Sequence, residues 1–98
     1  MNIQAMMKQA QKLQKDMMNA KEEIDNKKFI GKSSLVTVEV MGNKTVTNVK
    51  FDNESIELDD LELLQDMIVV AINDAMRQID KETEEKMGKY TQGMPGLF

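Results

Sequence analysis

The stretch Leu58–Met87, LDDLELLQDMIVVAINDAMRQIDKETEEKM, decides the fold of this 98-residue chain. Its apolar residues recur every three or four positions, which places them on one face of a helix; they are Leu61, Leu64, Ile68, Ala71, Ile72, Ala75, Met76 and Ile79. Asp59 is a candidate N-cap, with Glu62 as the return arm of a capping box. We predict a helix over residues 59–90. It would be roughly 45 Å long, whereas a compact chain of this size is only about 25 Å across, so part of it must project or pack on another chain.

A second amphipathic helix is predicted over residues 2–27, with Asn2 as its cap. Its apolar residues alternate between spacings of three and four, a heptad pattern held for three repeats; they are Ile3, Met6, Ala10, Leu13, Met17, Ala20 and Ile24, widened by Met7 and Met18. Lys8, Lys12 and Lys15 follow the same periodicity on the other side of the helix. We call these three lysines the basic ridge.

The segment between the helices, residues 28–51, has the pattern of short strands. Val36, Val38 and Val40 alternate with other residues over 35–41, as in a strand with one buried face. Gly42-Asn43 predicts a two-residue hairpin turn with positive φ angles, after which residues 45–51 return as the next strand. The sequence therefore predicts a small antiparallel sheet with one face covered by helix.

These elements predict an α+β fold in the order helix, two or three strands, long helix, in a single domain over residues 1–90. Glycine and proline in residues 91–98, TQGMPGLF, predict a flexible C-terminal tail. The composition, 41% hydrophobic with few aromatic residues, gives a thin core for a chain of this length. We therefore expect a homodimer in which the sheets and the adjoining helix turns form the interface and the distal helical ends project.

The residue types that are missing narrow the chemistry. The chain has no histidine and no cysteine, so the commonest general base and the thiolate nucleophile are both absent. We expect no enzyme activity, no catalytic residues, no metal site, no cofactor and no small-molecule substrate. No apolar run approaches the roughly 18 residues of a membrane span, and no signal peptide pattern is present, which predicts a cytoplasmic protein without a membrane partner.

The net charge of −4 is unevenly distributed along the chain. Residues 1–32 carry +3, whereas residues 50–98 carry −7. Lysines on an outer helix face often serve only solubility. A basic ridge on a projecting helix can also bind phosphates and release counterions.

Several short segments, taken together, carry a family resemblance. They are Met6-Met7-Lys8-Gln9-Ala10-Gln11 with Leu13-Gln14, Leu35-Val36-Thr37-Val38, Gly42-Asn43, Ala71-Ile72-Asn73-Asp74-Ala75-Met76-Arg77 and Gly93-Met94-Pro95-Gly96. In this order the chain resembles the YbaB/EbfC family of bacterial nucleoid-associated proteins over nearly its whole length. It departs from the family at Ser33-Ser34, where the family's turn is usually richer in glycine.

The resemblance implies an α-β-β-β-α protomer that forms a tweezer-like homodimer located in the cytoplasm and nucleoid. It also implies binding to double-stranded DNA with little sequence preference, through phosphate contacts, and an influence on DNA conformation and gene expression. The basic ridge supplies the best candidate DNA-binding residues. Weaker candidates lie among acidic neighbours on the second helix; they are Arg77, Lys81, Lys86 and Lys89.

Two questions stay open at this point. Asn73 and Asp74 are either part of a binding site or a structural pair that orders backbone near the sheet. The alternative function is a dimeric protein–protein adaptor that uses the amphipathic helices without binding DNA directly.

Overall fold

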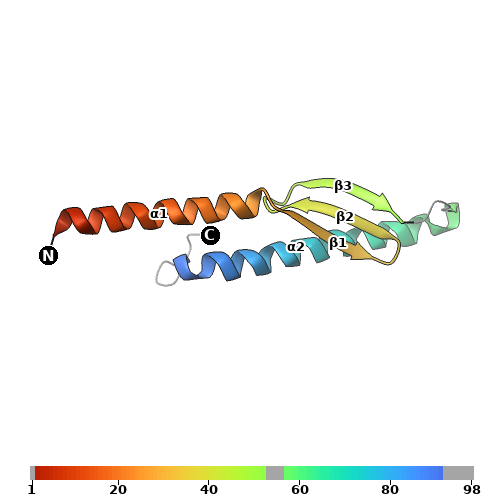
Figure 1. Ribbon diagram of the computed structural model, residues 1–98. Helices are drawn as coiled ribbons and strands as arrows, with labels where there is room; N and C mark the ends of the chain where they lie inside the picture. The colour runs from red at the N-terminus through yellow and green to blue at the C-terminus, as the bar shows by residue number, and fades with distance from the viewer. Residues whose placement is uncertain (1, 53–56, 92–98) are drawn as a thin grey trace.

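The computed structural model describes residues 2–52 and 57–91, except for the side chains of Leu58 and Thr91. Two long helices are joined through a three-stranded antiparallel sheet of order β1-β2-β3 (Figure 1). The elements are α1 (Ile3–Asp25), β1 (Lys28–Ser33), β2 (Val36–Met41), β3 (Val46–Phe51), a 3-10 turn (Leu58–Asp60) and α2 (Leu61–Thr91). The predicted α-β-β-β-α order is confirmed. Thr91 ends α2, and residues 92–98 of the predicted tail lie outside the described residues.

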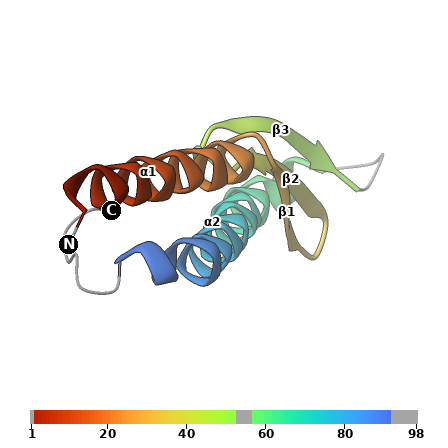
Figure 2. The ribbon, with the colours of Figure 1, turned by 60° about the vertical axis from the view of Figure 1, so that its left-hand side comes forward.

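The protomer is elongated, with principal extents of 71 × 20 × 14 Å and a radius of gyration of 19.3 Å. A compact chain of this length has a radius of gyration of about 13 Å. In two views, α1 leaves one end of the sheet and runs beside the C-terminal half of α2 (Figures 1 and 2). Residues 3–16 of α1 are all exposed, so this part of the helix forms a projecting arm.

The two ends of α1 are held differently. At the start, the Asn2 side chain accepts a hydrogen bond from the Gln4 N–H at 3.0 Å, which confirms the predicted cap. At the other end Ile24 is fully buried, with Met17 and Ala20 half-buried beside it. The predicted apolar seam is therefore covered only along its last two turns, and the helix ends at Asp25, two residues before the predicted boundary.

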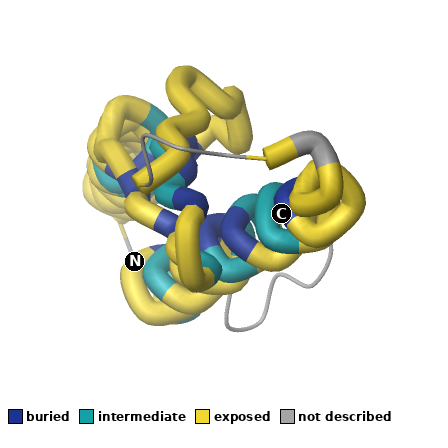
Figure 3. The backbone as a smooth tube through the Cα atoms, turned by 90° about the vertical axis from the view of Figure 1, so that its right-hand side faces the viewer, coloured by how far each residue is buried: buried dark blue, intermediate teal, exposed yellow. Residues whose placement is uncertain are grey.

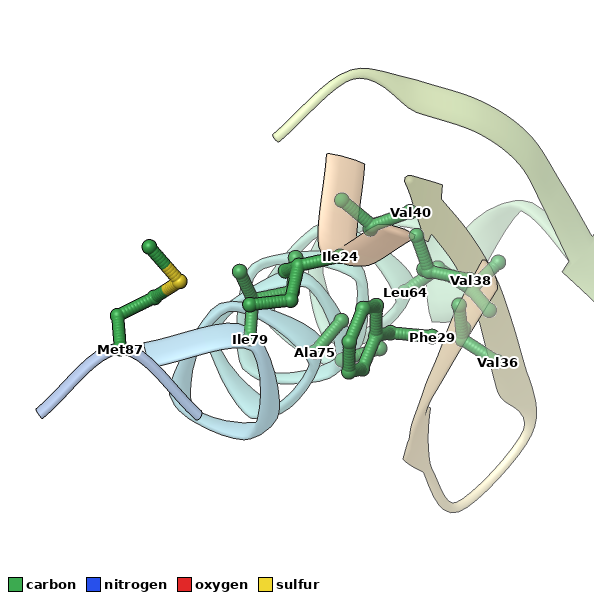
Figure 4. Close-up of a cluster of buried hydrophobic side chains, with 10 residues drawn as sticks. Ile24, Phe29, Val36, Val38, Val40, Leu64, Ala75, Ile79 and Met87 are labelled. Atoms are coloured by element: carbon green, nitrogen blue, oxygen red, sulfur yellow. The ribbon is translucent and has the colours of Figure 1, made fainter. Parts of the chain in front are cut away.

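The core lies between the sheet and α2. Val36, Val38 and Val40 of β2 are fully buried and turn toward α2 (Figure 4). The burial-coloured tube shows buried positions gathered in the interior and exposed backbone around them (Figure 3). The full core comprises Ile24, Phe29, Val36, Val38, Val40, Leu64, Ala71, Ala75, Ile79 and Met87. It contains no residue of β3.

The turn between β2 and β3 differs from the prediction. It is a three-residue loop in which the Lys44 N–H donates to the Met41 carbonyl at 2.8 Å, and the positive φ, 71°, falls on Lys44. The predicted two-residue turn with positive φ at Gly42 and Asn43 is wrong. Gly42 is needed for a different reason, because a Cβ there would lie 1.7 Å from the Ile24 carbonyl oxygen.

The start of α2 also differs from the prediction. Asp59 lies inside the 3-10 turn, and regular α-helix begins only at Leu61. Asp59 is therefore not the N-cap of α2. The predicted apolar face is otherwise the buried one: Leu64, Ala71, Ala75 and Ile79 are buried, while Leu61, at the helix start, is exposed.

Candidate nucleic-acid interface

The basic ridge lies on the projecting arm of α1. Lys8, Lys12 and Lys15 are exposed, and within the described residues none of them forms an ion pair. At about 100° per residue they fall on the side of the helix opposite Met17 and Ile24, which pack on the core. The ridge therefore points away from the body of the protomer.

The part of α1 that carries the ridge is basic as far as Lys15. Between Ile3 and Lys15 the helix contains no aspartate or glutamate. Asp16 is the first acidic residue of α1, and more follow toward its C-terminal end. There Lys21 is bound to Asp25, with 2.6 Å between Nζ and Oδ1. Cations near the sheet are thus mostly paired, whereas those on the arm are available for an external anion.

The four candidates on α2 do not form a comparable surface. Arg77 lies 3.8 Å from Asp74, Lys86 lies 3.8 Å from Glu82, and the Lys89 ammonium stands 5.0 Å from the centre of the Tyr90 ring. Lys81 has no ion pair within the described residues.

The α2 candidates also point in different directions. Arg77 and Lys81 share one side of the helix, and Lys86 lies about 140° round from Lys81 at 100° per residue. The α2 candidates therefore do not share one face of the helix.

Asp74 has a structural role. Its Oδ2 accepts hydrogen bonds from the Lys32 backbone N–H at 3.1 Å and from the Gln78 amide at 3.3 Å. Gln78 also donates to the Ile30 carbonyl at 2.7 Å. These side chains satisfy polar groups along the free edge of β1, which is a common way to protect an edge strand. Asn73 is exposed.

The outer face of the sheet holds one perturbed carboxyl. The Thr47 hydroxyl donates to Glu39 at 2.6 Å, and Lys28 lies 3.6 Å from the same carboxylate. The hydrogen bond from Thr47, and then the charge of Lys28, lower the pKa of Glu39 below its ordinary value. Glu39 therefore stays ionised and offsets part of the positive charge on this face.

Sequence reasoning missed Glu82. It belongs to an acidic run near the C-terminal end of α2, where charged side chains are usually solvated, yet only 19% of its side chain is exposed. Its carboxylate is bound by Lys27, from the segment between α1 and β1, at 2.5 Å. The four-residue spacing to Lys86 could have indicated one ion pair, but no local signal relates positions 27 and 82.

Two further findings concern metal ions and membranes. In the part of the chain that the structure describes, no three histidine, cysteine or acidic side chains come together to hold a metal ion. Over the same residues, neither helix is long and apolar enough to cross a bilayer.

The fold and the arm define a small α+β protein with an exposed group of unpaired lysines that suits phosphate groups. Comparison with known proteins identifies the family of this chain. The model of the YbaB/EbfC DNA-binding family matches residues 1–94, and the chain belongs to this family.

Sequence relatives support the same assignment. A nucleoid-associated protein of Lactococcus lactis subsp. cremoris (strain MG1363) is 53% identical over 97 residues, which cover 97% of this chain and 98% of that protein. A nucleoid-associated protein of Enterococcus faecalis is 44% identical over 98 residues, covering 98% and 94% respectively. Both relatives are named as nucleoid-associated proteins.

A solved structure confirms the fold. The uncharacterized protein HP0035 from Helicobacter pylori superposes with a TM-score of 0.73 over 92% of this chain and 97% of its own. Its sequence identity is 17%, so this similarity concerns the architecture alone.

Proposed function

We propose that this protein is a nucleoid-associated protein that binds duplex DNA through its phosphates, with little sequence preference. The observation that carries the proposal is the basic ridge, three lysines on an exposed arm that form no ion pair within the described residues and precede the first acidic residue of α1, Asp16. Lysine ammonium groups act as point charges toward phosphates, and phosphate contacts carry no direct sequence information. Family membership and the names of the relatives support DNA as the partner and the nucleoid as the location.

The composition of the arm supports low sequence preference. It contains no arginine, which is the commonest reader of guanine in the major groove, and no aromatic residue on which bases could stack. Arg77, Lys81, Lys86 and Lys89 would add weaker contacts, since three of them already have partners within the protomer.

The proposal includes a homodimer, for which the sheet supplies the argument. Register places Phe51 and Val49 of β3 beside the buried Val36 and Val38, on the face that α2 covers. However, β3 lies outside the core and all its residues are exposed. An apolar strip on β3 is thus left uncovered next to α2.

The uncovered surface of α2 completes the interface. Leu63, Val69 and Val70 are each at least half exposed, although they lie in the helix that organises the core. Leu63 and Val70, seven residues apart, lie on the same side of the helix, and grouped exposed apolar side chains mark association sites. In a two-fold dimer, α2 of one protomer would pack under β3 of the other, burying both surfaces and leaving the α1 arms free. Two arms on one dimer could contact one duplex at two points and so alter its path.

The interface can be tested with a matched pair of variants. Val49→Asp should dissociate the dimer, because it puts a charge into the apolar strip. Asn48→Asp adds the same charge one residue away, on the outer face of the sheet, and should remain dimeric. Sedimentation equilibrium checks both. A dimeric Val49→Asp variant, or a monomeric wild type, contradicts this interface.

The DNA-binding surface can be tested by making the same change in charge at two different places, the arm and the sheet. Lys8→Glu with Lys12→Glu should weaken binding to an arbitrary labelled duplex by about 10- to 100-fold in fluorescence anisotropy. Lys32→Glu with Lys50→Glu changes the net charge equally at two sheet lysines without ion pairs in the described structure, and should have a much smaller effect. Equal losses for the two variants would refute the arm as the binding surface.

A second candidate function, a protein–protein adaptor, is favoured by one observation. Ile3, Met6 and Leu13 are exposed along the arm, on the side opposite the basic ridge. Pull-down from an extract treated with nuclease separates the two functions. Stoichiometric protein partners that survive nuclease, together with absent DNA binding at low salt, would favour the adaptor.

A further inference from the structure

The direction of the α1 arm is fixed at one place, where α1 meets the sheet and α2. Ile24 is buried there, and the Gly42 N–H donates to the Lys27 carbonyl at 2.9 Å. The Lys27 ammonium extends to α2, where its Nζ lies 2.5 Å from Glu82 Oε1. We call the contacts of Ile24, Lys27, Gly42 and Glu82 the joint.

Glu82 is an unusual member of the joint. Its Oε1 is bound by Lys27, while its Oε2 is buried and accepts no hydrogen bond in the described structure, with Lys86 Nζ 3.8 Å away. Removing a carboxylate from water is costly, and an ion pair in such a place often adds little to stability compared with apolar packing. Its more useful contribution is to restrict geometry, because a charge that leaves water must keep its partner at a defined position.

The geometry that Glu82 restricts is that of the basic ridge. Lys12 lies fifteen residues before Lys27, which corresponds to roughly 22 Å along a helix. At this distance from the joint, a tilt of α1 by about 10° would move the ridge by roughly 4 Å. Few other contacts oppose such a tilt, since residues 3–16 are exposed.

We propose that Glu82 is a positioning residue that holds the α1 arm in the direction required for DNA binding, by binding Lys27 across the joint. The inference rests on the proposed function in one respect, that the arm contacts DNA. The direction of the arm itself can be measured without DNA, so the two proposals can fail separately.

The first test measures the arm directly. Because the chain has no cysteine, Gln11→Cys and Asn48→Cys allow spin labels on the exposed side of α1 and on the sheet. Diluting the labelled protein with unlabelled protein leaves only the distance within one chain. Glu82→Gln and Lys27→Gln should each broaden and shift the distance distribution, whereas Glu85→Gln, at an exposed neighbour, should reproduce the wild type.

Two variants keep this test decisive. If Glu82→Gln fails to fold by circular dichroism, Lys27→Gln breaks the same ion pair from the other side. A folded variant of either residue with an unchanged distance distribution overturns the proposal.

The second test uses the sign of the effect on DNA binding. Glu82→Gln and Glu85→Gln each remove one negative charge per chain, so electrostatics alone predicts equal or tighter binding. If Glu82 positions the arm, the Glu82→Gln variant should bind DNA roughly three- to tenfold more weakly. The slope of log K against log [salt] should be unchanged, because every lysine is retained. Tighter binding by Glu82→Gln overturns the proposal. If charge reversal of the basic ridge leaves binding intact, the proposed function fails, and the distance measurement still decides the role of Glu82.

Discussion

The two ends of α1 belong to one helix and one amphipathic pattern, yet they have opposite environments. Ile24 is fully buried and surrounded by elements from three parts of the chain, whereas Ile3 is 72% exposed. Periodicity alone marks both isoleucines as core residues. An apolar stripe therefore shows which face of a helix can be buried. The length and position of the neighbouring elements decide how much of that face is buried.

The largest effect is expected where the sheet and α2 approach most closely. A Cβ at Gly31 would lie 2.0 Å from the Ala71 carbonyl oxygen and 2.8 Å from the Ala75 nitrogen. Because both are backbone atoms of α2, Gly31→Ala must separate strand from helix and should lower the free energy of unfolding by about 3 kcal/mol or more.

The control for Gly31 lies at the other end of α2. A Cβ at Gly88 would meet no atom of the described residues within 4 Å apart from the backbone of its own helix, so Gly88→Ala should be neutral or stabilising by up to about 1 kcal/mol. Urea unfolding measures both variants. Equal stabilities would mean that β1 does not lie against α2 as described.

The next largest effect on the free energy of unfolding is expected within α1, where a buried and an exposed isoleucine can be compared. Ile24→Ala creates a cavity at the joint and should cost about 2–3 kcal/mol. Ile3→Ala removes the same atoms from an exposed position and should change the free energy of unfolding by less than about 0.5 kcal/mol. Urea unfolding at a fixed protein concentration checks the pair. A large cost for Ile3→Ala would show that the arm is covered in solution, by a second chain or by another part of its own.

The smallest effect concerns acid stability at the exposed face of the sheet. The pKa of Glu39 is lower in the folded chain than its ordinary value of 4.5. Ionised Glu39 therefore favours the folded state fully above that value, and this contribution is lost as the pH falls through the lower, folded pKa.

Glu39→Gln should consequently be slightly less stable than the wild type at pH 7, and the difference should vanish in acid. Thermal unfolding from pH 7 to pH 3 follows it. A difference that grows as the pH falls would contradict the hydrogen bond from Thr47 as the cause.

Features that depend on interactions between residues close in sequence could be predicted, whereas features that depend on contacts between distant parts of the chain could not. The alternation of Val36, Val38 and Val40 and the cap at Asn2 are local, so the sequence was sufficient to predict a buried strand face and the helix start. The turn at Gly42 could not be predicted, because the residue serves a contact with Ile24 in another element.

The candidate site divides in the same way. The basic ridge lies within two turns of one helix, and its spacing is visible in the sequence. The partners of Glu82 and Asp74 are 55 and 42 residues away in the chain, at Lys27 and Lys32. Only the fold brings them together, and no pattern in a single sequence reports such pairs.

The proposal that the arm binds DNA through its charge can be tested by the salt dependence of the affinity for a DNA duplex. Fluorescence anisotropy of an arbitrary duplex, titrated over a range of salt concentrations, gives the slope of log K against log [salt] for the wild type and for Lys8→Gln with Lys12→Gln and Lys15→Gln. Each lost phosphate contact lowers the slope by about 0.9. We expect the magnitude of the slope to fall by about 2.7 if one arm of a dimer contacts DNA and by about 5.4 if both do. An unchanged slope would show that the basic ridge does not touch the phosphates.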